Sequence, residues 1–444
     1  MGCQQSKLEG ASDTMSSLSD DNIRKSSPSK MRGGSNKNLC ITTNNSDRTA
    51  NTQTSDVDDE DDDNVSNLSE CEKRLVPSDI LNSRITESGS ATYRRSSTCN
   101  KALSIEFAAC TQSGYYPRDP TKANQDSFSV KVIAENSDND SSCFFAVYDG
   151  HGPKGEIFAQ YAKEKLPNIM FQHVQEQRKK IYEEKNDFIT NVLTFNSSAY
   201  PLLNEKEFEI ASTNAHLECN RRMIEDHKKD VIYSGTTATS ISIHNGKLIV
   251  SNVGDSRAIL GCRNSRHSAR DNPITAVPLS RDHTAWRKDE RERIKAAGGR
   301  ILSIGQMEGI IPINRVESGL GDKSPGEDDF LDELGDPPRV WCKDIGVPGT
   351  SFTRSLGDSI GEQIGVIAQP EFYSKDITDD DKLVVIASDG VFEFLTNQDV
   401  IDICMNSSSP ADACEQIVSR SYQEWLANED RADDITAIVI SLGK

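Results

Sequence analysis

Short apolar runs alternate with longer segments of helical periodicity through most of the chain after residue 125. Runs rich in β-branched and aromatic residues and bounded by Gly, Asp or Asn predict buried strands. We expect strands at Asp126–Ile133, Ser142–Tyr148, Ala238–Ile243, Lys247–Val253, Ala258–Gly261, Lys382–Ala387 and Asp434–Leu442. Helical spacing predicts helices at Gly155–Arg178, Glu205–Asp230 and Trp286–Ala297, the last closed by a Gly-Gly pair that suits a helix C-terminus.

Strands that gather toward both ends of this region, with helical blocks between them, predict an α+β fold. In such a fold, packed antiparallel sheets are flanked by helices. The runs before and after Gly254-Asp255-Ser256 predict a β-hairpin with Asp255 at its tip. Residues 303–344 break the pattern with many Gly, Pro, Asp and Glu, which predicts either a mobile acidic flap beside the site or an inert insertion.

The first hundred residues have a different composition. They are dominated by Ser, Asn, Asp and Lys, and their first aromatic residue is Tyr93. Such a segment has too little apolar surface to offset the conformational entropy that folding removes. We therefore expect a disordered tail over residues 1–100 and a catalytic domain over 101–444, with the globular part beginning near Ala102 to Phe107.

Composition excludes several classes of protein. The net charge of −20 argues against nucleic acid as a partner, because phosphate binding requires a basic surface. The eleven cysteines are scattered without a CxxC pair, which predicts reduced thiols rather than disulfides or a zinc site. Apolar runs stay shorter than the ~18 residues that span a bilayer. We expect a monomer, with solvated acidic blocks at residues 56–63 and 327–333.

The N-terminal sequence predicts a lipid anchor. Met1-Gly2-Cys3-Gln4-Gln5-Ser6 fits the N-myristoylation pattern with Gly2 as acceptor, and Cys3 suits palmitoylation. One acyl chain holds a protein only marginally, so a second signal is needed. Cys3 or the basic cluster Arg24, Lys25, Lys30, Arg32 and Lys37 would supply it. We expect a peripheral protein on the cytoplasmic face of a membrane, at the inner leaflet, with a cytosolic pool. The alternative is an unmodified tail.

The candidate chemistry lies in aspartates at strand ends. Asp149 follows one apolar run, Asp389 follows another, and the pair Asp433-Asp434 opens a third. An Asp-Gly dipeptide alone is a common tight turn, but three such sites can converge on one pocket. Converging carboxylates repel one another, and a divalent cation relieves that repulsion; Mg²⁺ and Mn²⁺ prefer oxygen ligands.

The ordered set of motifs resembles the metal-dependent protein phosphatases of type 2C, which act on phosphoserine and phosphothreonine in proteins. The matching segments follow the family's order over roughly residues 105 to 442. They are Lys122–Phe128, Phe145–Gly152, Ser234–Ala238, Val253–Ala258, Leu279–His283, Thr353–Asp358, Ala387–Glu393 and Asp433–Thr436. The resemblance implies an α-β-β-α sandwich of two central antiparallel sheets, in agreement with the pattern of strands and helices.

The resemblance also implies a site for two Mg²⁺ or Mn²⁺ ions and a weaker third. Such a site activates a water nucleophile and clamps the phosphoryl oxygens. Asp149 would bridge two ions, Asp126 would act through water, and Asp255 would hold the third. By resemblance, the full ligand set is Asp126, Asp149, Gly150, Asp255, Asp389 and Asp433. Gln125 and Glu393 depart from residues of some family members, which leaves the metal stoichiometry open.

Two more residues have roles by resemblance. His151 matches the general acid that protonates the leaving seryl oxygen, and imidazole can carry a proton near neutral pH. Lys122 lies near the position of a phosphate-binding Arg and would act as a point charge. The segment Cys414 to Arg420 has the spacing of cysteine phosphatases, but it lacks a glycine and reads as helix. His283 and Arg257 are interpreted as structural.

Two alternatives to a protein phosphatase remain at this point. A pseudophosphatase would use the same fold only for binding, but it would be expected to lose one of Asp149, Asp389 and Asp433, and all are present. The second alternative is a metal-dependent hydrolase of small phosphoesters, which turnover of a phosphopeptide against a small phosphometabolite would separate from a protein phosphatase. The expected partners are phosphorylated proteins. Ser97, in Arg94-Arg95-Ser96-Ser97, resembles a kinase site.

Overall fold

The structure is a computed structural model of the whole chain. It describes residues 84–96, 99–134, 141–185, 202–244, 246–263, 274–310, 337–343 and 346–443. The chain divides into units 1–61 and 62–444, and all described residues belong to the second. Gly2, Cys3, Ser97 and both acidic blocks lie outside the described residues. Within the described ranges, the helices lack the combination of length and hydropathy needed to cross a bilayer.

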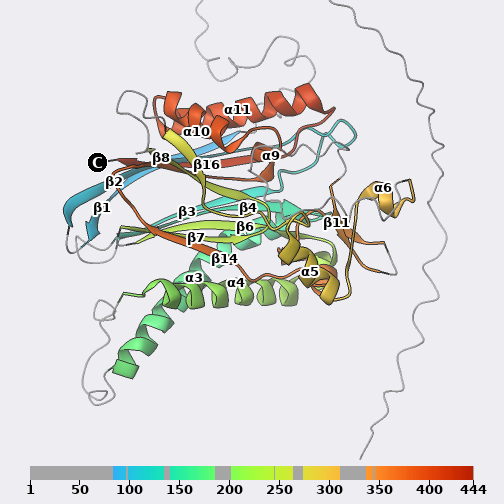
Figure 1. Cartoon of the computed structure of the whole chain (residues 1–444), viewed down its shortest axis with the longest axis horizontal. Helices are drawn as coiled ribbons and strands as arrows, with labels where there is room; N and C mark the ends of the chain where they lie inside the picture. Colours follow the sequence, from blue (N-terminus) through green and yellow to red (C-terminus); the bar gives the residue numbers. More distant parts are fainter. Residues whose placement is uncertain are drawn as a thin grey trace, which may run out of the picture. The chain divides into compact units, whose positions relative to one another are not determined.

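Two antiparallel sheets stack face to face between helical layers (Figure 1). In spatial order the six-stranded sheet contains β1 (Ile85–Ser96), β2 (Cys99–Gln112), β16 (Ile435–Gly443), β15 (Asp381–Ala387), β8 (Arg257–Arg263) and β9 (Ile274–Pro278). The seven-stranded sheet contains β13 (Leu356–Gly357), β5 (Gly235–Thr236), β4 (Ser141–His151), β6 (Ala238–His244), β7 (Lys247–Val253) and β14 (Glu371–Asp376), with β3 (Asp126–Ala134) paired to β4.

Helices cover the outer face of each sheet. The six-stranded sheet packs against α10 (Asn397–Asn406) and α11 (Pro410–Asn428), and the seven-stranded sheet packs against α3 (Gly155–Lys185) and α4 (Glu205–Asp226) (Figure 1). The shorter helices are η2 (Asp230–Ile232), α5 (Lys288–Ala296), α6 (Ile304–Met307), α8 (Ser359–Glu362) and α9 (Asp389–Phe392). This α-β-β-α sandwich confirms the predicted fold. Each predicted strand and helix is present, although α4 ends before the predicted Asp230.

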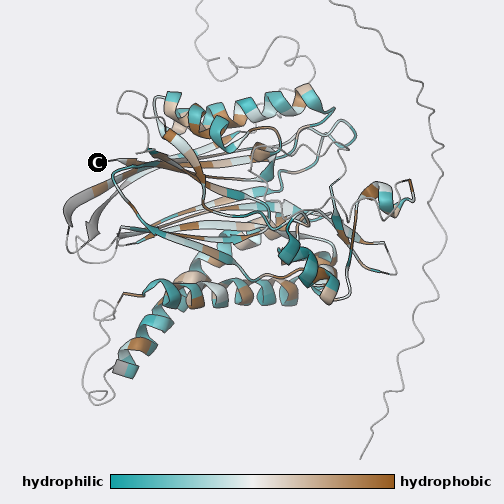
Figure 2. Cartoon of the chain, in the orientation of Figure 1, coloured by the Kyte–Doolittle hydropathy of each residue, from teal (hydrophilic) through white to brown (hydrophobic). Residues whose placement is uncertain are grey.

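The apolar runs are continuous because the inner strands are buried on both faces. In β4, Phe145 and Val147 face the core between the sheets, whereas Phe144, Ala146 and Tyr148 pack under α3 and α4. Hydrophobic colours accordingly run along the strands of both sheets, while the helices mix both kinds of residue (Figure 2). A strand buried on both faces reads as an apolar run, without the alternation of a half-exposed strand.

The folded domain begins earlier than composition indicated. β1 pairs with β2 from Ile85 opposite Thr111 to Ser96 opposite Cys99, and the Arg84 guanidinium donates to Gln112 Oε1 at 2.6 and 2.9 Å. The predicted disordered tail is therefore wrong for residues 85–96, and the domain boundary at residue 101 is too late. β1 is an edge strand held by backbone hydrogen bonds, so it needs few apolar side chains. For residues 1–83 the disordered tail stays a prediction.

This strand predicts where the chain can be shortened. A chain beginning at Arg84 should keep the melting temperature of the full chain, because it retains the whole of β1. A chain beginning at Lys101 should melt about 5 °C lower or more, since β2 loses its β1 partner from Ala102 to Thr111, and 1 kcal/mol corresponds to roughly 2–4 °C in domains of about 150–250 residues. Differential scanning calorimetry measures both; equal melting temperatures for the two would show that β1 contributes nothing to stability.

Asp255 does not lie at the tip of a hairpin. β7 pairs with β6 and β14, whereas β8 pairs with β15 and β9 in the other sheet. Residues 254–256 therefore carry the chain from one sheet to the other, and Gly254 adopts φ +107°, which favours glycine. Local pattern cannot separate a hairpin from such a crossing, because both flanking strands are almost fully buried.

The two ends of the predicted flap are regular structure. β10 (Arg300–Leu302), β11 (Arg339–Trp341) and β12 (Pro348–Thr350) form a small antiparallel sheet. The Ser303 side chain caps α6, and the Trp341 indole donates to the Leu302 carbonyl at 2.7 Å. Capping and strand pairing thus give regular structure at both ends of 303–344, and the choice between a mobile flap and an inert insertion stays a prediction. Residues 311–336 lie outside the described part.

Candidate active site

A cavity of about 220 Å³ opens at the end of the sandwich where the predicted acids converge. It contains all the predicted site residues of the described part except Asp126, which lies just behind it. The lining residues are Tyr116, Lys122, Gln125, Asp149, Gly150, His151, Gly152, Thr237, Asp255, Ser351, Phe352, Asp389, Arg431 and Asp433. Residues widely separated in the sequence therefore build one polar pocket.

Both sheets contribute carboxylates. Asp149 lies near the end of β4 and directly opposite Asp126 on β3, so strand pairing fixes these two acids side by side. In the six-stranded sheet, Asp389 opens α9 just after β15, and Asp433 precedes β16. Beside Asp149, an added Cβ on Gly150 would lie 2.3 Å from the Gly155 carbonyl oxygen, so only glycine fits this close approach.

Asp126 ties the two sheets together at this end. Its Oδ2 accepts a hydrogen bond from the Ser388 hydroxyl at 2.8 Å. The same Ser388 oxygen accepts from the Thr436 backbone N–H at 3.0 Å. Asp126 is only 6% exposed, so its carboxylate supports the wall of the cavity from behind.

The neighbours Asp433 and Asp434 have different surroundings. Asp434 is buried and accepts from the backbone N–H groups of Gly114 and Gln125 at 2.6 and 2.9 Å, which holds the loop before β3. Asp433 lines the cavity and accepts from the Tyr116 hydroxyl. The side chain available to a ligand is therefore that of Asp433, the member of the pair chosen by resemblance.

The acids raise one another's proton affinity. Burial raises the pKa of Asp149 and of Asp255 well above the usual range, and repulsion by Asp389 is the next largest cause for both. Burial and Asp433 raise the pKa of Asp389 to about 7. Buried carboxylates that repel in this way are a set of hard oxygen donors suited to Mg²⁺ or Mn²⁺. The residues present thus fit the metal ions that the resemblance implies.

A second group of carboxylates is an ion-pair network. In the described part of the chain, three carboxylates come within 4.8 Å of one another only at Asp289, Glu290 and Glu371. Arg287 binds Asp289 and Glu371 at 2.6 and 2.7 Å, and Arg354 binds Glu290 at 2.7 Å. Guanidinium groups already neutralise these acids. The acids of the cavity are spread more widely than this trio.

His151 is held by a residue that sequence reasoning missed. Its Nε2 lies 2.6 Å from Oδ2 of Asp358, which is 1% exposed, and its ring lies 4.0 Å from the Phe352 ring. Asp358 adopts φ +48°, and its backbone N–H donates to the Ser234 carbonyl at 3.0 Å. The signal was available, because Asp358 closes the matched segment Thr353–Asp358.

Two cations border the cavity beside Asp433. The Lys122 ammonium lies 3.7 Å from the centre of the Tyr116 ring. Burial, followed by Asp433, raises the pKa of Tyr116, so its hydroxyl stays a donor. Arg431 lines the same wall and is exposed. The sequence analysis did not identify Tyr116 or Arg431, although Arg431 lies two residues before Asp433.

The remaining candidates have structural surroundings. Arg257 forms a buried ion pair with Asp282 at 2.7 Å, and His283 Nδ1 accepts from the Gly254 N–H at 3.1 Å. Burial lowers the pKa of His283. Cys414 is fully buried in α11, and burial raises its pKa well above the usual range, which is the opposite of what a cysteine nucleophile needs.

Gln125 and Glu393, the two departures from the family pattern, differ in their contacts. Gln125 Nε2 donates to the Gly152 carbonyl at 2.8 Å and to Glu156 at 3.2 Å, which fixes the turn before α3. Burial and Asp433 raise the pKa of Glu393. Gln125 therefore borders the cavity as a positioning residue, and Glu393 adds to the negative field of the site.

Comparison with known proteins identifies the same family as the sequence motifs, protein phosphatase 2C. The model of the family described as Protein phosphatase 2C matches residues 121–424. Probable protein phosphatase 2C 35 of Arabidopsis thaliana is 37% identical over 338 residues, which cover 76% of this chain and 84% of that protein. Probable protein phosphatase 2C 73 of rice is 28% identical over 68% of this chain and 65% of that protein.

A solved structure has the same fold. The serine-threonine phosphatase 2C from Toxoplasma gondii superposes with a TM-score of 0.56 at 15% identity, over 81% of this chain and 99% of that one. The fold and the acidic cavity define a metal-dependent phosphatase. The chain belongs to the protein phosphatase 2C family, and it is a serine/threonine protein phosphatase.

Proposed function

We propose that the cavity holds two Mg²⁺ or Mn²⁺ ions shared through Asp149, and a weaker third ion at Asp255. The observation that supports this most is the convergence of Asp149, Asp389 and Asp433 from both sheets on one small cavity. The Gly150 carbonyl would complete one shell, and Asp126 would act through water. When bound, the ions supply an activated water and neutralise charge on the phosphoryl group.

The number of ions can be measured directly. Isothermal titration of the metal-free protein with Mn²⁺ should give two tight sites and one weaker site. Asp255→Asn should remove the weaker site and leave the two tight sites. A single tight site in the unchanged protein would refute the shared role given to Asp149.

The chain's own residues perform the other steps. His151 delivers the proton to the seryl oxygen as the P–O bond breaks, and Asp358 orients the imidazole for that transfer. Lys122 and Arg431, on one wall of the cavity, hold the phosphate of the substrate. The substrates are phosphorylated proteins. Because Arg431 is exposed, a phosphate on the surface of a protein can reach it. The enzyme acts as a monomer.

Lys122→Ala and Arg431→Ala should each raise KM for a phosphopeptide while leaving kcat nearly unchanged. A hydrogen bond to a charged group contributes about 1.5–3 kcal/mol, which corresponds to roughly 10-fold or more in KM for Lys122. Arg431 should show a smaller effect, because it is exposed and screened by salt. Arg420→Ala, on the outer side of α11, is the matched control. An unchanged KM in both variants would remove these residues from phosphate binding.

We also propose that the protein is anchored to the cytoplasmic face of a membrane, with a cytosolic pool. Support comes from the sequence alone: Gly2 in a myristoylation pattern, Cys3 beside it, and the basic cluster between residues 24 and 37. An acyl chain together with basic residues gives the two signals that stable binding to an anionic leaflet requires.

Gly2→Ala should move the protein from the membrane fraction to the cytosol, because acylation requires the N-terminal glycine. Activity on a soluble phosphopeptide should not change. Cys3→Ser should weaken retention less, since the first acyl chain and the basic cluster remain. Fractionation of cells that express each form measures this; equal membrane fractions for the Gly2→Ala and unchanged proteins would rule out the anchor.

A further inference from the structure

A second cavity lies between the seven-stranded sheet and α3, away from the active site. Its volume is about 780 Å³, within the range of small-molecule sites. The catalytic cavity uses residues 149–152 at one end of β4, whereas this cavity uses residues 142–144 near the other end. The two cavities share no lining residue among those described.

The walls of this cavity are largely apolar. The apolar lining consists of Phe144, Pro167, Met170, Phe171, Val174, Leu203, Phe208 and Ile249. Along α3 the apolar lining extends from Pro167 to Val174, an axial length of about 10 Å at 1.5 Å per residue, with Gln175 and Arg178 beyond it. An apolar wall of this length suits one short hydrocarbon chain.

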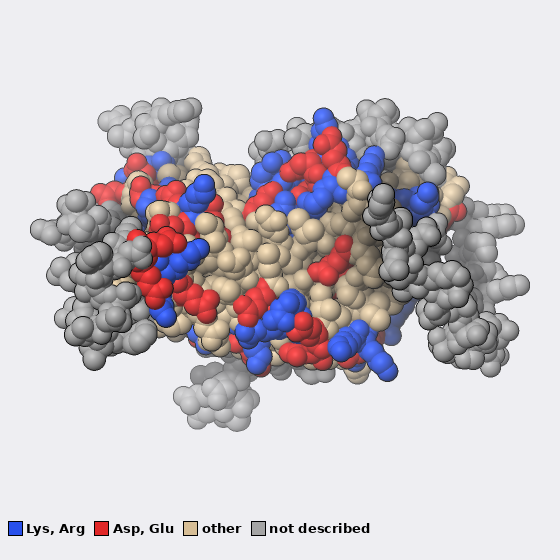
Figure 3. Space-filling model, turned by 90° about the horizontal axis from the view of Figure 1, so that it is seen from below, with Lys and Arg blue, Asp and Glu red and all other residues tan. Residues whose placement is uncertain are grey.

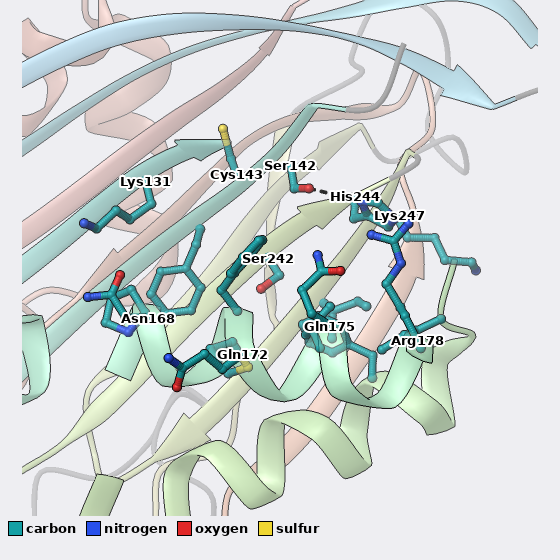
Figure 4. A pocket seen from close by; sticks show the side chains of 18 of the residues that line it. Lys131, Ser142, Cys143, Asn168, Gln172, Gln175, Arg178, Ser242, His244 and Lys247 are labelled. Carbon is teal, nitrogen blue, oxygen red and sulfur yellow. Dashed lines mark hydrogen bonds between the residues drawn. The ribbon is translucent and has the colours of Figure 1, made fainter. Parts of the chain in front are cut away.

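One polar atom in the wall lacks a partner. Gln175 Oε1 is enclosed and accepts no hydrogen bond. Figure 4 shows the Gln175 amide pointing into the space between the helix and the strands, whereas Ser142 and His244 bond to each other. A buried acceptor without a donor costs free energy, so this position favours a ligand that donates one hydrogen.

The charges of the wall favour an anion. Lys131, Arg178 and Lys247 outnumber the only acid in the described lining, Glu205, in a protein whose net charge is −20. Lys247 is already bonded to Glu205 and Asp376 at 2.8 and 2.9 Å. Arg178 is 4% exposed and already contacts other groups, and its guanidinium places a buried positive charge in the wall of the cavity. Arg178 lies three residues after Gln175, on the same side of α3 and closer to the end of the helix.

The surface formed by α3 and α4 has exposed apolar side chains that a lipid could contact before it enters the cavity. Seen from below, the face on which α3 and α4 lie has a broad area without charged side chains, bordered by charged residues (Figure 3). Phe171 on α3, and Ile210 and Leu217 on α4, are each more than 40% exposed. A lipid could leave a membrane or micelle against such a surface.

We propose that this cavity binds a single-chain anionic lipid, with its acyl chain along α3 and its head group at Gln175 and Arg178. A lysophosphatidate has each required part: one acyl chain, a hydroxyl that donates to Gln175 Oε1, and a phosphate that contacts Arg178. This site is independent of the phosphatase reaction and of the N-terminal anchor.

The test uses octanoyl lysophosphatidate, whose chain matches the apolar wall between Pro167 and Val174, below its critical micelle concentration and with the full-length protein. Isothermal titration should show saturable binding of one molecule per chain. Val174→Trp, which fills the cavity, should abolish binding. Gln175→Leu should weaken binding several-fold without lowering the melting temperature, because it removes the unpaired acceptor. Monooctanoylglycerol, which lacks the anion, should bind at least 10-fold more weakly.

A charge-matched pair of variants on α3 completes the test. Arg178→Gln should weaken lysophosphatidate binding about 10-fold, whereas Lys180→Gln, which is exposed and outside the lining, should not. Absence of saturable binding would overturn the proposal. Binding that Val174→Trp and Gln175→Leu leave unchanged would overturn it too, because the lipid would then occupy another surface.

Discussion

Asp149→Asn should lower turnover of a phosphopeptide by several orders of magnitude at low Mn²⁺. The substitution removes one negative charge and one oxygen ligand from the residue that lies between the acids of both sheets. Metal affinity should fall with it, since Mg²⁺ and Mn²⁺ depend on charged oxygen ligands. Kinetics across a Mn²⁺ titration measure both effects. EDTA should abolish activity of the unchanged enzyme, and added Mn²⁺ or Mg²⁺ should restore it.

Asp149→Asn lowers activity, but it should not lower the folding stability of the metal-free protein. Burial and repulsion raise the folded-state pKa values of Asp149 and Asp389, that of Asp389 to about 7. Unfolded aspartate titrates near 3.9, so the folded protein binds more protons between about pH 4 and pH 7. Stability of the EDTA-treated protein should therefore fall as pH rises through this window.

Asp149→Asn should flatten that pH dependence and leave the metal-free protein no less stable at pH 7. Thermal melts in EDTA at several pH values test this, with Asp402→Asn on the exposed side of α10 as control. Near unchanged turnover by Asp149→Asn at low Mn²⁺ would contradict the two-metal site. A metal-free variant that melts far below the unchanged protein would instead contradict the repulsion among these acids.

His151→Ala should give the second largest loss. Proton transfer by a positioned group contributes about 10²–10⁴-fold, and the expected fall in kcat on a phosphoserine peptide lies in this range. The loss should be small for p-nitrophenyl phosphate, because its leaving group departs without a proton. Asp358→Asn should show the same dependence on the leaving group with a smaller loss, since it removes the contact at 2.6 Å that orients the ring.

A structural role for His151 would give a different result. Both substrates would then lose activity equally, and metal affinity would fall in parallel. Comparison of kcat for the two substrates at saturating Mn²⁺ separates these outcomes. An equal loss on both substrates would remove the proton-donor role proposed for His151.

Sequence reasoning predicted the features that depend on local pattern. Strands buried on both faces appear as apolar runs, so β4, β15 and β16 were found together with the acids at their ends. It missed β1, because an edge strand can be polar, and it mistook the crossing at Asp255 for a hairpin, since pairing partners are not a local property. Phe352 and Tyr116 were missed because their importance comes from contacts made only in the folded chain, whereas Asp358 lay in a matched segment and was given no role there.

The position of β16 has a consequence for synthesis of the enzyme. β16 is the last strand of the domain, yet it lies between β2 and β15 in the middle of its sheet. While the ribosome extends the chain, the edges of β2 and β15 that pair with β16 therefore stay unpaired until residues 435–443 emerge. Asp433 arrives with that strand, so a nascent chain has no complete acidic site. If Asp433 acts as proposed, activity appears only when the domain is complete, and until then the unpaired strand edges favour aggregation.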